Sequence, residues 1–407
     1  MGMDSKTSLN DNVIRSYLSL VRLGIGHEAE IPATVDWNAV RLLASKQGLA
    51  AIVLDGVKAL MDLSADSSSE DGRRASSALA SLGLDFKFDW MGESVVLYEQ
   101  RYEQYKKTIR RLAKFYNTRG FKMMVLKGYG LSLNYPVPLH RPCGDIDIWQ
   151  FGRYKEADAA LAREKGIKID NSHHHHSVFY VDGFMVENHY DIINVHVYKA
   201  NAELERTFKS MAMDDSHFVE VGEEKVYLPS ANLHALFLLK HSISHFASTE
   251  INIRHVLDWA FFVEKHFSAI DWKWLVGVLG RFKMLEFFNC LNAICVEDLG
   301  FDAGVFASAN EALNVECCSN RFDRGYSSSR DYMMACVDPV LKQRVLRDMI
   351  SPEFSEEEPK GNVFKRVAFK YRRWQANAWK QRLCYSDNRF VSFWKSVWAH
   401  LLKPSSI

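Results

Sequence analysis

Two aspartates, Asp145 and Asp147, are separated by one residue in the stretch CGDIDI. Alternating acidic and apolar residues predict a β-strand, in which successive side chains point to opposite faces. Both carboxylates then share one face, while Ile146 and Ile148 anchor the other face in the core. Two neighbouring carboxylates repel each other unless a cation lies between them. Oxygen ligands of this kind suit Mg²⁺, which commonly bridges protein carboxylates and substrate phosphates. The pair therefore predicts a site for Mg²⁺ or Mn²⁺.

A third acid is expected to complete this site. Glu187 lies in the segment FMVENHYD, which reads as a strand that follows an Asp182-Gly183 hairpin turn. His189 faces the same way as Glu187 in such a strand, and Asp191 continues that face. We expect Glu187 to be the third carboxylate, with Asp191 as the alternative.

Phosphate-binding groups precede the aspartates in the sequence. Lys127 and Gly128 stand where a short apolar strand, FKMMVLKG, runs into a turn. Glycine lets backbone N–H groups approach a phosphate, and a lysine supplies positive charge. Arg141 is expected to clamp a phosphate oxygen with two hydrogen bonds. These three residues are the predicted substrate-binding groups.

Helices are predicted on both sides of these elements. Residues 11–60 read as helices, with Asp36 as an N-cap, and a longer helix is expected over 86–119. The serine-rich segment 63–72 reads as a loop. The stretches SVFYV, VHVY and FVEVGEEKVYLP are predicted strands, and YKEADAALAREKG is a predicted helix.

We therefore expect an α+β fold, with a mixed β-sheet core flanked by N-terminal and C-terminal helical regions. The predicted division is an N-terminal helical region, an α/β core, a C-terminal helical domain, and an acidic linker followed by a basic aromatic tail: 1–120, 121–229, 230–350 and 351–407.

These motifs together resemble a known family. The Leu126-Lys127-Gly128 turn, the arginine before the GDIDI strand, the E-x-H element and the pair His241 and His245 are similar to the uncharacterised nucleotidyltransferase family of the DNA polymerase β-like superfamily. The resemblance implies transfer of an NMP group from a nucleoside triphosphate such as ATP to a hydroxyl acceptor, with release of pyrophosphate. It implies two metals held by Asp145, Asp147 and Glu187. The acceptor stays open between a small molecule, a sugar phosphate, a protein and an RNA end.

Composition narrows the class of protein. Lys+Arg is 51 and Asp+Glu is 50, so no global charge draws the chain to nucleic acid or membrane. The seven cysteines include no CxxC pair and suggest reduced thiols in a cytoplasm. The sequence contains no uncharged apolar stretch of the length that a transmembrane helix needs, so we expect none.

Other charged groups have structural interpretations. The tract His173–His176 could bind a transition metal, but a polar loop is the preferred interpretation. His241 and His245 are expected to be a structural pair. Arg254 and Asp258 are expected to form an i,i+4 helix pair. The basic aromatic tail is expected to dock on its own protein rather than on a nucleic acid or a membrane.

Two other functions compete with nucleotidyl transfer. A glycosyltransferase can also use an Asp-x-Asp motif to bind a metal and a nucleotide sugar, but it requires several β-α units before that motif. The first 120 residues read mostly as helix instead. A non-catalytic relic that binds a nucleotide or a partner protein is the second alternative.

Overall fold

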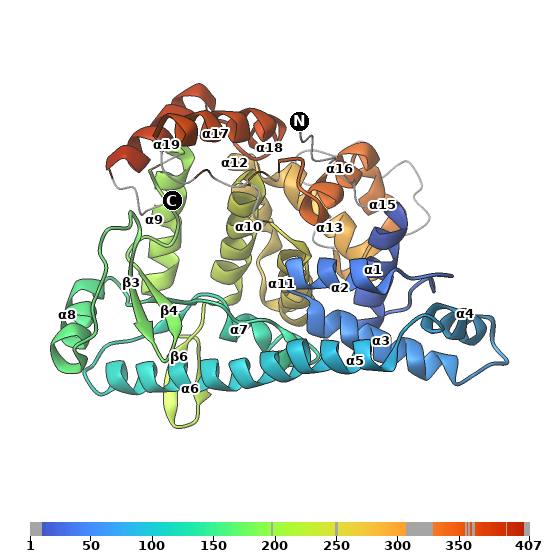
Figure 1. Ribbon diagram of the computed structural model, residues 1–407. Helices are drawn as coiled ribbons and strands as arrows, with labels where there is room; N and C mark the ends of the chain where they lie inside the picture. Colours follow the sequence, from blue (N-terminus) through green and yellow to red (C-terminus); the bar gives the residue numbers. More distant parts are fainter. Residues whose placement is uncertain are drawn as a thin grey trace.

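The computed structural model describes residues 10–402 apart from 197, 249–250, 307–328, 355, 357–358, 360–362 and 388. One mixed sheet lies among many helices (Figure 1). Its strand order is β3-β4-β2-β1-β6-β5. The predicted α+β fold, with helical regions on both sides of the sheet in sequence, is confirmed.

Helices alone precede the sheet within the described residues. Asp36 caps α2 as predicted, since its side chain accepts a hydrogen bond from the Ala39 amide at 3.0 Å. The predicted loop over 63–72 is shorter than expected, because α3 continues to Ser64 and Ser69 caps a further helix. The bounds are α1 Asp11–Gly24, α2 Trp37–Lys46, α3 Ala50–Ser64, α4 Glu70–Leu79 and α5 Leu84–Trp90.

The long predicted helix is confirmed and contains a π-helical segment. Helix α5 passes through Met91–Val96 in π-helical geometry into α6, Leu97–Asn117. Helix α6 lies along one side of the sheet (Figure 1). Its apolar face, including Tyr105 and Ile109, shares a core with Ile146 and Ile148 of strand β2. The two isoleucines therefore fix the face of β2 opposite to Asp147.

The strands follow the predicted hairpins. Asp182 and Gly183 both have positive φ, 53° and 83°, and join β3 to β4 in a tight turn. Strand β2 pairs antiparallel with β1 and parallel with β4. The strand predicted before Gly128 is only two residues long. The bounds are β1 Met124–Val125, β2 Ile146–Trp149, β3 His176–Val181, β4 Phe184–His189, β5 Phe218–Val221 and β6 Glu224–Tyr227, with α7 Tyr129–Ser132, a 3₁₀ turn Pro138–His140 and α8 Tyr154–Lys165 between them.

The strand predicted at VHVY is wrong for its described residues, which form no strand. The chain leaves the sheet after His189 because a side chain takes the place of a neighbouring strand. The Glu205 carboxylate accepts hydrogen bonds from the amides of Ile192 and Ile193, both at 2.9 Å. Glu205 belongs to α9, Lys199–Met213, which begins directly after this segment.

The C-terminal helices pack with the N-terminal ones in one large apolar core. The tail docks on this body as predicted: Tyr385 stacks on Tyr198 with ring centroids 3.6 Å apart, and buried Lys380 pairs with buried Asp348. Among the described residues, no helix has the length and apolar character needed to cross a membrane. The bounds are α10 Ala231–Ser248, α11 Ile253–His266, α12 Trp272–Arg281, α13 Leu285–Glu297, α15 Ser329–Ala335, α16 Pro339–Ile350, α17 Val363–Ala376, α18 Ala378–Cys384 and α19 Arg389–Leu402, with a 3₁₀ turn Phe267–Ala269 after α11.

Candidate functional site

The parallel pairing of β2 with β4 brings the predicted acids together. Asp147 lies directly opposite Glu187 in the register of the two strands. Both side chains leave the sheet on the face opposite to α6, since the neighbouring Ile146 and Val186 belong to the core beneath that helix. Asp145 immediately precedes β2 and is about one third exposed, whereas the side chain of Asp147 is 3% exposed.

Lys127 links the two aspartates. Its Nζ lies 3.1 Å from Oδ1 of Asp147 and 3.7 Å from Oδ2 of Asp145. Burial disfavours the charged ammonium, but Asp147, Asp145 and Glu187 outweigh that effect and raise the pKa of Lys127 above its ordinary value. Lys127 is therefore a charged group beside the two aspartates.

His189 is a second cation in the same cluster. Its Nε2 lies 3.2 Å from Oδ1 of Asp147 and 3.5 Å from Oε2 of Glu187. Burial opposes protonation, but the hydrogen bonds to these two carboxylates raise the pKa of His189 to about 9. Burial also acts against ionisation of Glu187, yet His189 and Lys127 lower the pKa of Glu187 below its usual value.

The cluster fits a divalent cation. One carboxylate oxygen each from Asp147 and Glu187 and a ring nitrogen of His189 lie within 4.8 Å of one another, and His189 would have to lose its proton to bind a metal. The second carboxylate oxygen of Asp147, Oδ2, is buried and has no hydrogen-bond partner in the described part of the chain. A buried carboxylate oxygen without a donor is costly, and a metal ion would satisfy it. Asp145 joins this group through Lys127.

Asp191, the alternative third acid, lies apart from this cluster. Strand β4 ends at His189, so the predicted alternation does not extend to Asp191. The Asp191 carboxylate forms an ion pair with Lys209 of α9. The structure thus places Glu187 beside Asp147 and gives Asp191 a different partner.

The histidine tract contributes to the site, which its interpretation as a polar loop did not anticipate. His176 is the first residue of β3 and lies opposite His189 in the hairpin. Its Nδ1 is 3.8 Å from Oε2 of Glu187, and ligand nitrogens of His175, His176 and His189 form a second tight group. Burial and the neighbouring cations lower the pKa of His176 to about 3 and that of His175 to about 2, so both imidazoles are neutral.

Gly128 follows Lys127 in a conformation that glycine favours. Its φ is 71°, and a Cβ atom built there would lie 2.2 Å from the Tyr105 hydroxyl. That hydroxyl donates a hydrogen bond to the Asp145 carbonyl at 3.0 Å. A side chain at this position would therefore displace the tyrosine that holds the backbone of the first aspartate.

Arg141 is held in a buried ion pair. Its Nε and Nη2 donate to the two carboxylate oxygens of Asp258, at 2.7 and 2.9 Å, and Tyr135 donates to the same carboxylate at 2.7 Å. Its Nη1 donates to the Gly128 carbonyl at 3.2 Å. Asp258 is thus the partner of Arg141. The helix pair predicted between Asp258 and Arg254 is wrong, since no ion pair joins them in the described residues.

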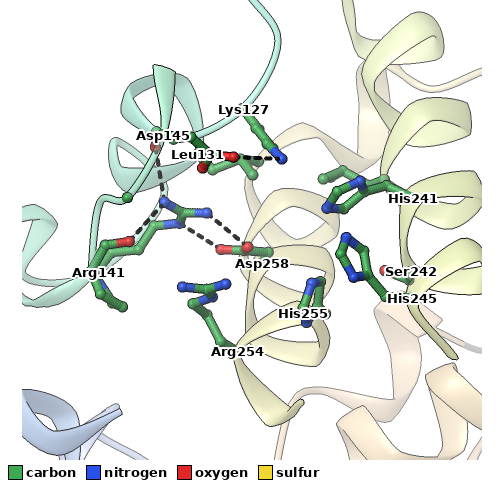
Figure 2. Close-up of a pocket in the computed structure, with 14 residues that line it drawn as sticks. Lys127, Leu131, Arg141, Asp145, His241, Ser242, His245, Arg254, His255 and Asp258 are labelled. Atoms are coloured by element: carbon green, nitrogen blue, oxygen red, sulfur yellow. Dashed lines mark hydrogen bonds and ion pairs between the residues drawn. The ribbon is translucent and has the colours of Figure 1, made fainter. Parts of the chain in front are cut away.

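A cavity of about 180 Å³ lies between the Lys127–Gly128 turn and helices α10 and α11 (Figure 2). Lys127 and Asp145 line one side, and the imidazoles of the helices line the other. The sequence interpretation missed Arg254 and His255 as part of this wall, because their neighbours in space come from distant segments. The remaining residues that line it are Gly128, Leu131, Arg141, Pro142, Gly144, Leu238, His241, Ser242, His245 and Asp258.

Comparison with known proteins identifies a family. A family model described as uncharacterised nucleotidyltransferase matches residues 33–299, which include the acids of the cluster and the wall of the cavity. No curated protein matches the chain, and no solved structure does.

Proposed function

Since the chain belongs to the uncharacterised nucleotidyltransferase family, we propose that it transfers an NMP group from a nucleoside triphosphate to a hydroxyl acceptor. The acceptor oxygen would form a bond to the α-phosphorus as the bond to the β-phosphate breaks and pyrophosphate leaves. We propose ATP as the first nucleotide to test, and a reaction of the polymerase β type with two divalent cations.

One observation supports this proposal above the others. The β2–β4 register holds Asp147 beside Glu187, and an oxygen of Asp147 lacks a partner among the described residues although it is buried. We propose Asp145, Asp147 and Glu187 as the ligands of Mg²⁺ or Mn²⁺. When bound, such ions activate an acceptor hydroxyl and stabilise the charge that develops on a pyrophosphate leaving group.

The cationic residues of the site would prepare it for a polyphosphate. Lys127 lies within 4 Å of both aspartates, so its ammonium can move from a carboxylate to a phosphate oxygen without leaving the cluster. His189 bridges Asp147 and Glu187 and fixes the orientation of both carboxylates. Gly128 lines the cavity, so its backbone can approach a phosphate there. Arg141 would support this phosphate site through the turn, since the nitrogen that does not face Asp258 donates to the Gly128 carbonyl.

The acceptor proton requires a base within the site. Glu187 lies in the cluster, whereas the carboxylate of Asp191 is paired with Lys209. We therefore propose Glu187 as the third acid and as the group that helps to remove the proton.

The test is incubation with each α-³²P-labelled nucleoside triphosphate, Mg²⁺ or Mn²⁺, and a cell extract. We expect label to appear in a protein, RNA or metabolite fraction, and the Asp147→Asn variant to transfer at least about a hundredfold less. The matched control is Asp214→Asn, which changes an exposed aspartate at the end of α9.

Two results would contradict the proposal. Equal transfer by wild type and Asp147→Asn would show that the carboxylate cluster takes no part in the reaction. Metal-dependent nucleotide binding without any transfer would favour the non-catalytic alternative. A glycosyltransferase is disfavoured because no strand occurs among the described residues before Met124.

A further inference from the structure

The cavity beside the carboxylate cluster carries an excess of positive charge. Its wall contains three cationic side chains, Lys127, Arg141 and Arg254, and two carboxylates, Asp145 and Asp258. Two of the cations have carboxylate partners, since Lys127 contacts the aspartates of the cluster and Arg141 is paired with Asp258. Arg254 is the remaining cation.

The Arg254 guanidinium contains a buried nitrogen without an acceptor in the described part of the chain. Its Nε is buried and has no hydrogen-bond partner among the described residues. An arginine stays charged in proteins, and a buried donor without an acceptor costs about 1–3 kcal/mol. In Figure 2 the guanidinium lies below the Asp258 carboxylate, with Arg141 on one side and His255 on the other. An anion in the cavity would supply the missing acceptor.

Three imidazoles surround the same space. His241 and His245 lie one turn apart on α10 with ring centroids 4.3 Å apart, and His255 of α11 lies 4.9 Å from His245. Burial, together with the nearby cations, lowers the pKa of His241 and of His255 well below the ordinary value, so both rings are neutral. A neutral imidazole can donate one N–H to an anion.

The histidines alone could equally hold a transition metal, since their ligand nitrogens lie within 4.8 Å of one another. Arg254 favours the anion. It lies next to His255 in the sequence and lines the same cavity, so it would repel a metal ion and attract a phosphate. The cavity of about 180 Å³ is also smaller than the ~300–1,000 Å³ pockets that take a whole small-molecule ligand. It therefore fits one end of a substrate.

We propose that this cavity is a phosphate-binding subsite in which Arg254, His241 and His245 hold a phosphoryl group of the substrate next to the carboxylate cluster. This inference rests on the proposed nucleotidyl transfer. The phosphoryl group would belong either to the triphosphate or to a phosphorylated acceptor.

The test is calorimetric titration of the full chain with pyrophosphate and with inorganic phosphate, in EDTA so that no metal bridges the acids. We expect the wild type to bind, and Arg254→Gln to bind about tenfold to a hundredfold more weakly, as for the loss of a charged hydrogen bond of about 1.5–3 kcal/mol. Arg254→Lys keeps the charge and should retain part of the affinity. Arg15→Gln, on the exposed face of α1, is the matched control.

Competition identifies the source of the phosphate. If the cavity holds the triphosphate, ATP will displace pyrophosphate, and Arg254→Gln will weaken both. If the cavity holds an acceptor phosphate, inorganic phosphate will still bind when ATP is saturating. The affinity for inorganic phosphate will then depend on Arg254, and the affinity for ATP will not. Either result supports the subsite.

The subsite and the proposed reaction fail separately. Pyrophosphate binding that depends on Arg254, without any labelled transfer, would support the phosphate subsite and contradict the proposed nucleotidyl transfer. Transfer with equal pyrophosphate affinity in wild type, Arg254→Lys and folded Arg254→Gln would overturn the subsite. So would no phosphate binding by the wild type, or binding of one Zn²⁺ that requires His241 and His255 and leaves pyrophosphate unbound.

Discussion

Two groups of buried charge lie on either side of the Lys127–Gly128 turn, and they are satisfied to different degrees. In the pair of Arg141 with Asp258, both carboxylate oxygens accept from the arginine, and Tyr135 adds a third hydrogen bond. In the carboxylate cluster, Asp147 has one oxygen bound by Lys127 and His189 and another without a partner in the described part of the chain.

The difference separates a structural site from a ligand site. A buried polar group with all its partners stabilises one arrangement of the chain, whereas a buried group that lacks a partner is costly until a ligand arrives. We therefore expect mutations in the arginine pair to act on folding and mutations in the carboxylate cluster to act on binding and transfer.

The largest effect on stability is expected from breaking the arginine pair. Asp258→Asn leaves the Arg141 guanidinium buried without a counter-charge, so the free energy of unfolding should fall by about 3–5 kcal/mol. Urea unfolding measures this change. The double variant Arg141→Met with Asp258→Leu should lose less than Asp258→Asn, because it removes both charges. A loss below 1 kcal/mol for Asp258→Asn would contradict the comparison.

Gly128→Ala is expected to have the next largest effect. The substitution places a Cβ 2.2 Å from the Tyr105 hydroxyl at a φ of 71°. The free energy of unfolding should therefore fall by about 2–3 kcal/mol. Tyr105→Phe removes the clashing oxygen, and the double variant should recover part of the loss despite the missing hydrogen bond to the Asp145 carbonyl. Thermal unfolding of the wild type, the two single variants and the double variant measures this coupling between Gly128 and Tyr105. Strict additivity of the two single effects would refute it.

The local part of the site could be predicted from the sequence. Strand alternation alone is enough to place Asp147 opposite to its flanking isoleucines, and the Asp182-Gly183 turn sets the hairpin that carries Glu187. The position of Lys127 next to the glycine turn likewise made it a predicted substrate-binding residue. These features depend on neighbours within a few residues, where backbone geometry decides the outcome.

The rest depends on contacts between distant segments. The pairing of Arg141 with Asp258 spans 117 residues, so helical spacing favoured Arg254 instead. The VHVY segment has strand composition, but Glu205 binds the amides of Ile192 and Ile193 just before it. No local pattern shows that the cavity wall combines a turn of the core with two later helices.

Asp147→Asn should separate function from stability. The substitution removes a negative charge that a metal would need. The two neighbouring cations still have partners, since Lys127 contacts Asp145 and His189 contacts Glu187. The free energy of unfolding should therefore change by less than about 2 kcal/mol, against the 3–5 kcal/mol expected for a broken buried pair. Urea unfolding beside the transfer assay tests both halves. A large loss of stability with little loss of transfer would reverse the roles of the two groups.

His140 provides the smallest and most exposed case of the same comparison. Its Nδ1 lies 2.5 Å from Asp55 of α3, and its Nε2 lies 3.3 Å from Glu99 of α6, which is 45% exposed. Burial disfavours the charged ring, but these two acids raise the pKa of His140 above its ordinary value. A raised folded-state pKa stabilises the fold below the unfolded pKa of about 6.5, and that contribution is lost as pH rises through the folded pKa.

The expected contribution of this pair is therefore present at pH 6 and diminished at alkaline pH. Because the acids are partly exposed and solvent screens them, we expect less than about 1 kcal/mol. The measurement is the free energy of unfolding of wild type and His140→Gln at pH 6 and pH 9, and the difference between the two proteins should shrink with rising pH. A difference that stays constant or grows would show that His140 acts through packing, and the contrast between satisfied and unsatisfied charge would then rest on the two buried groups alone.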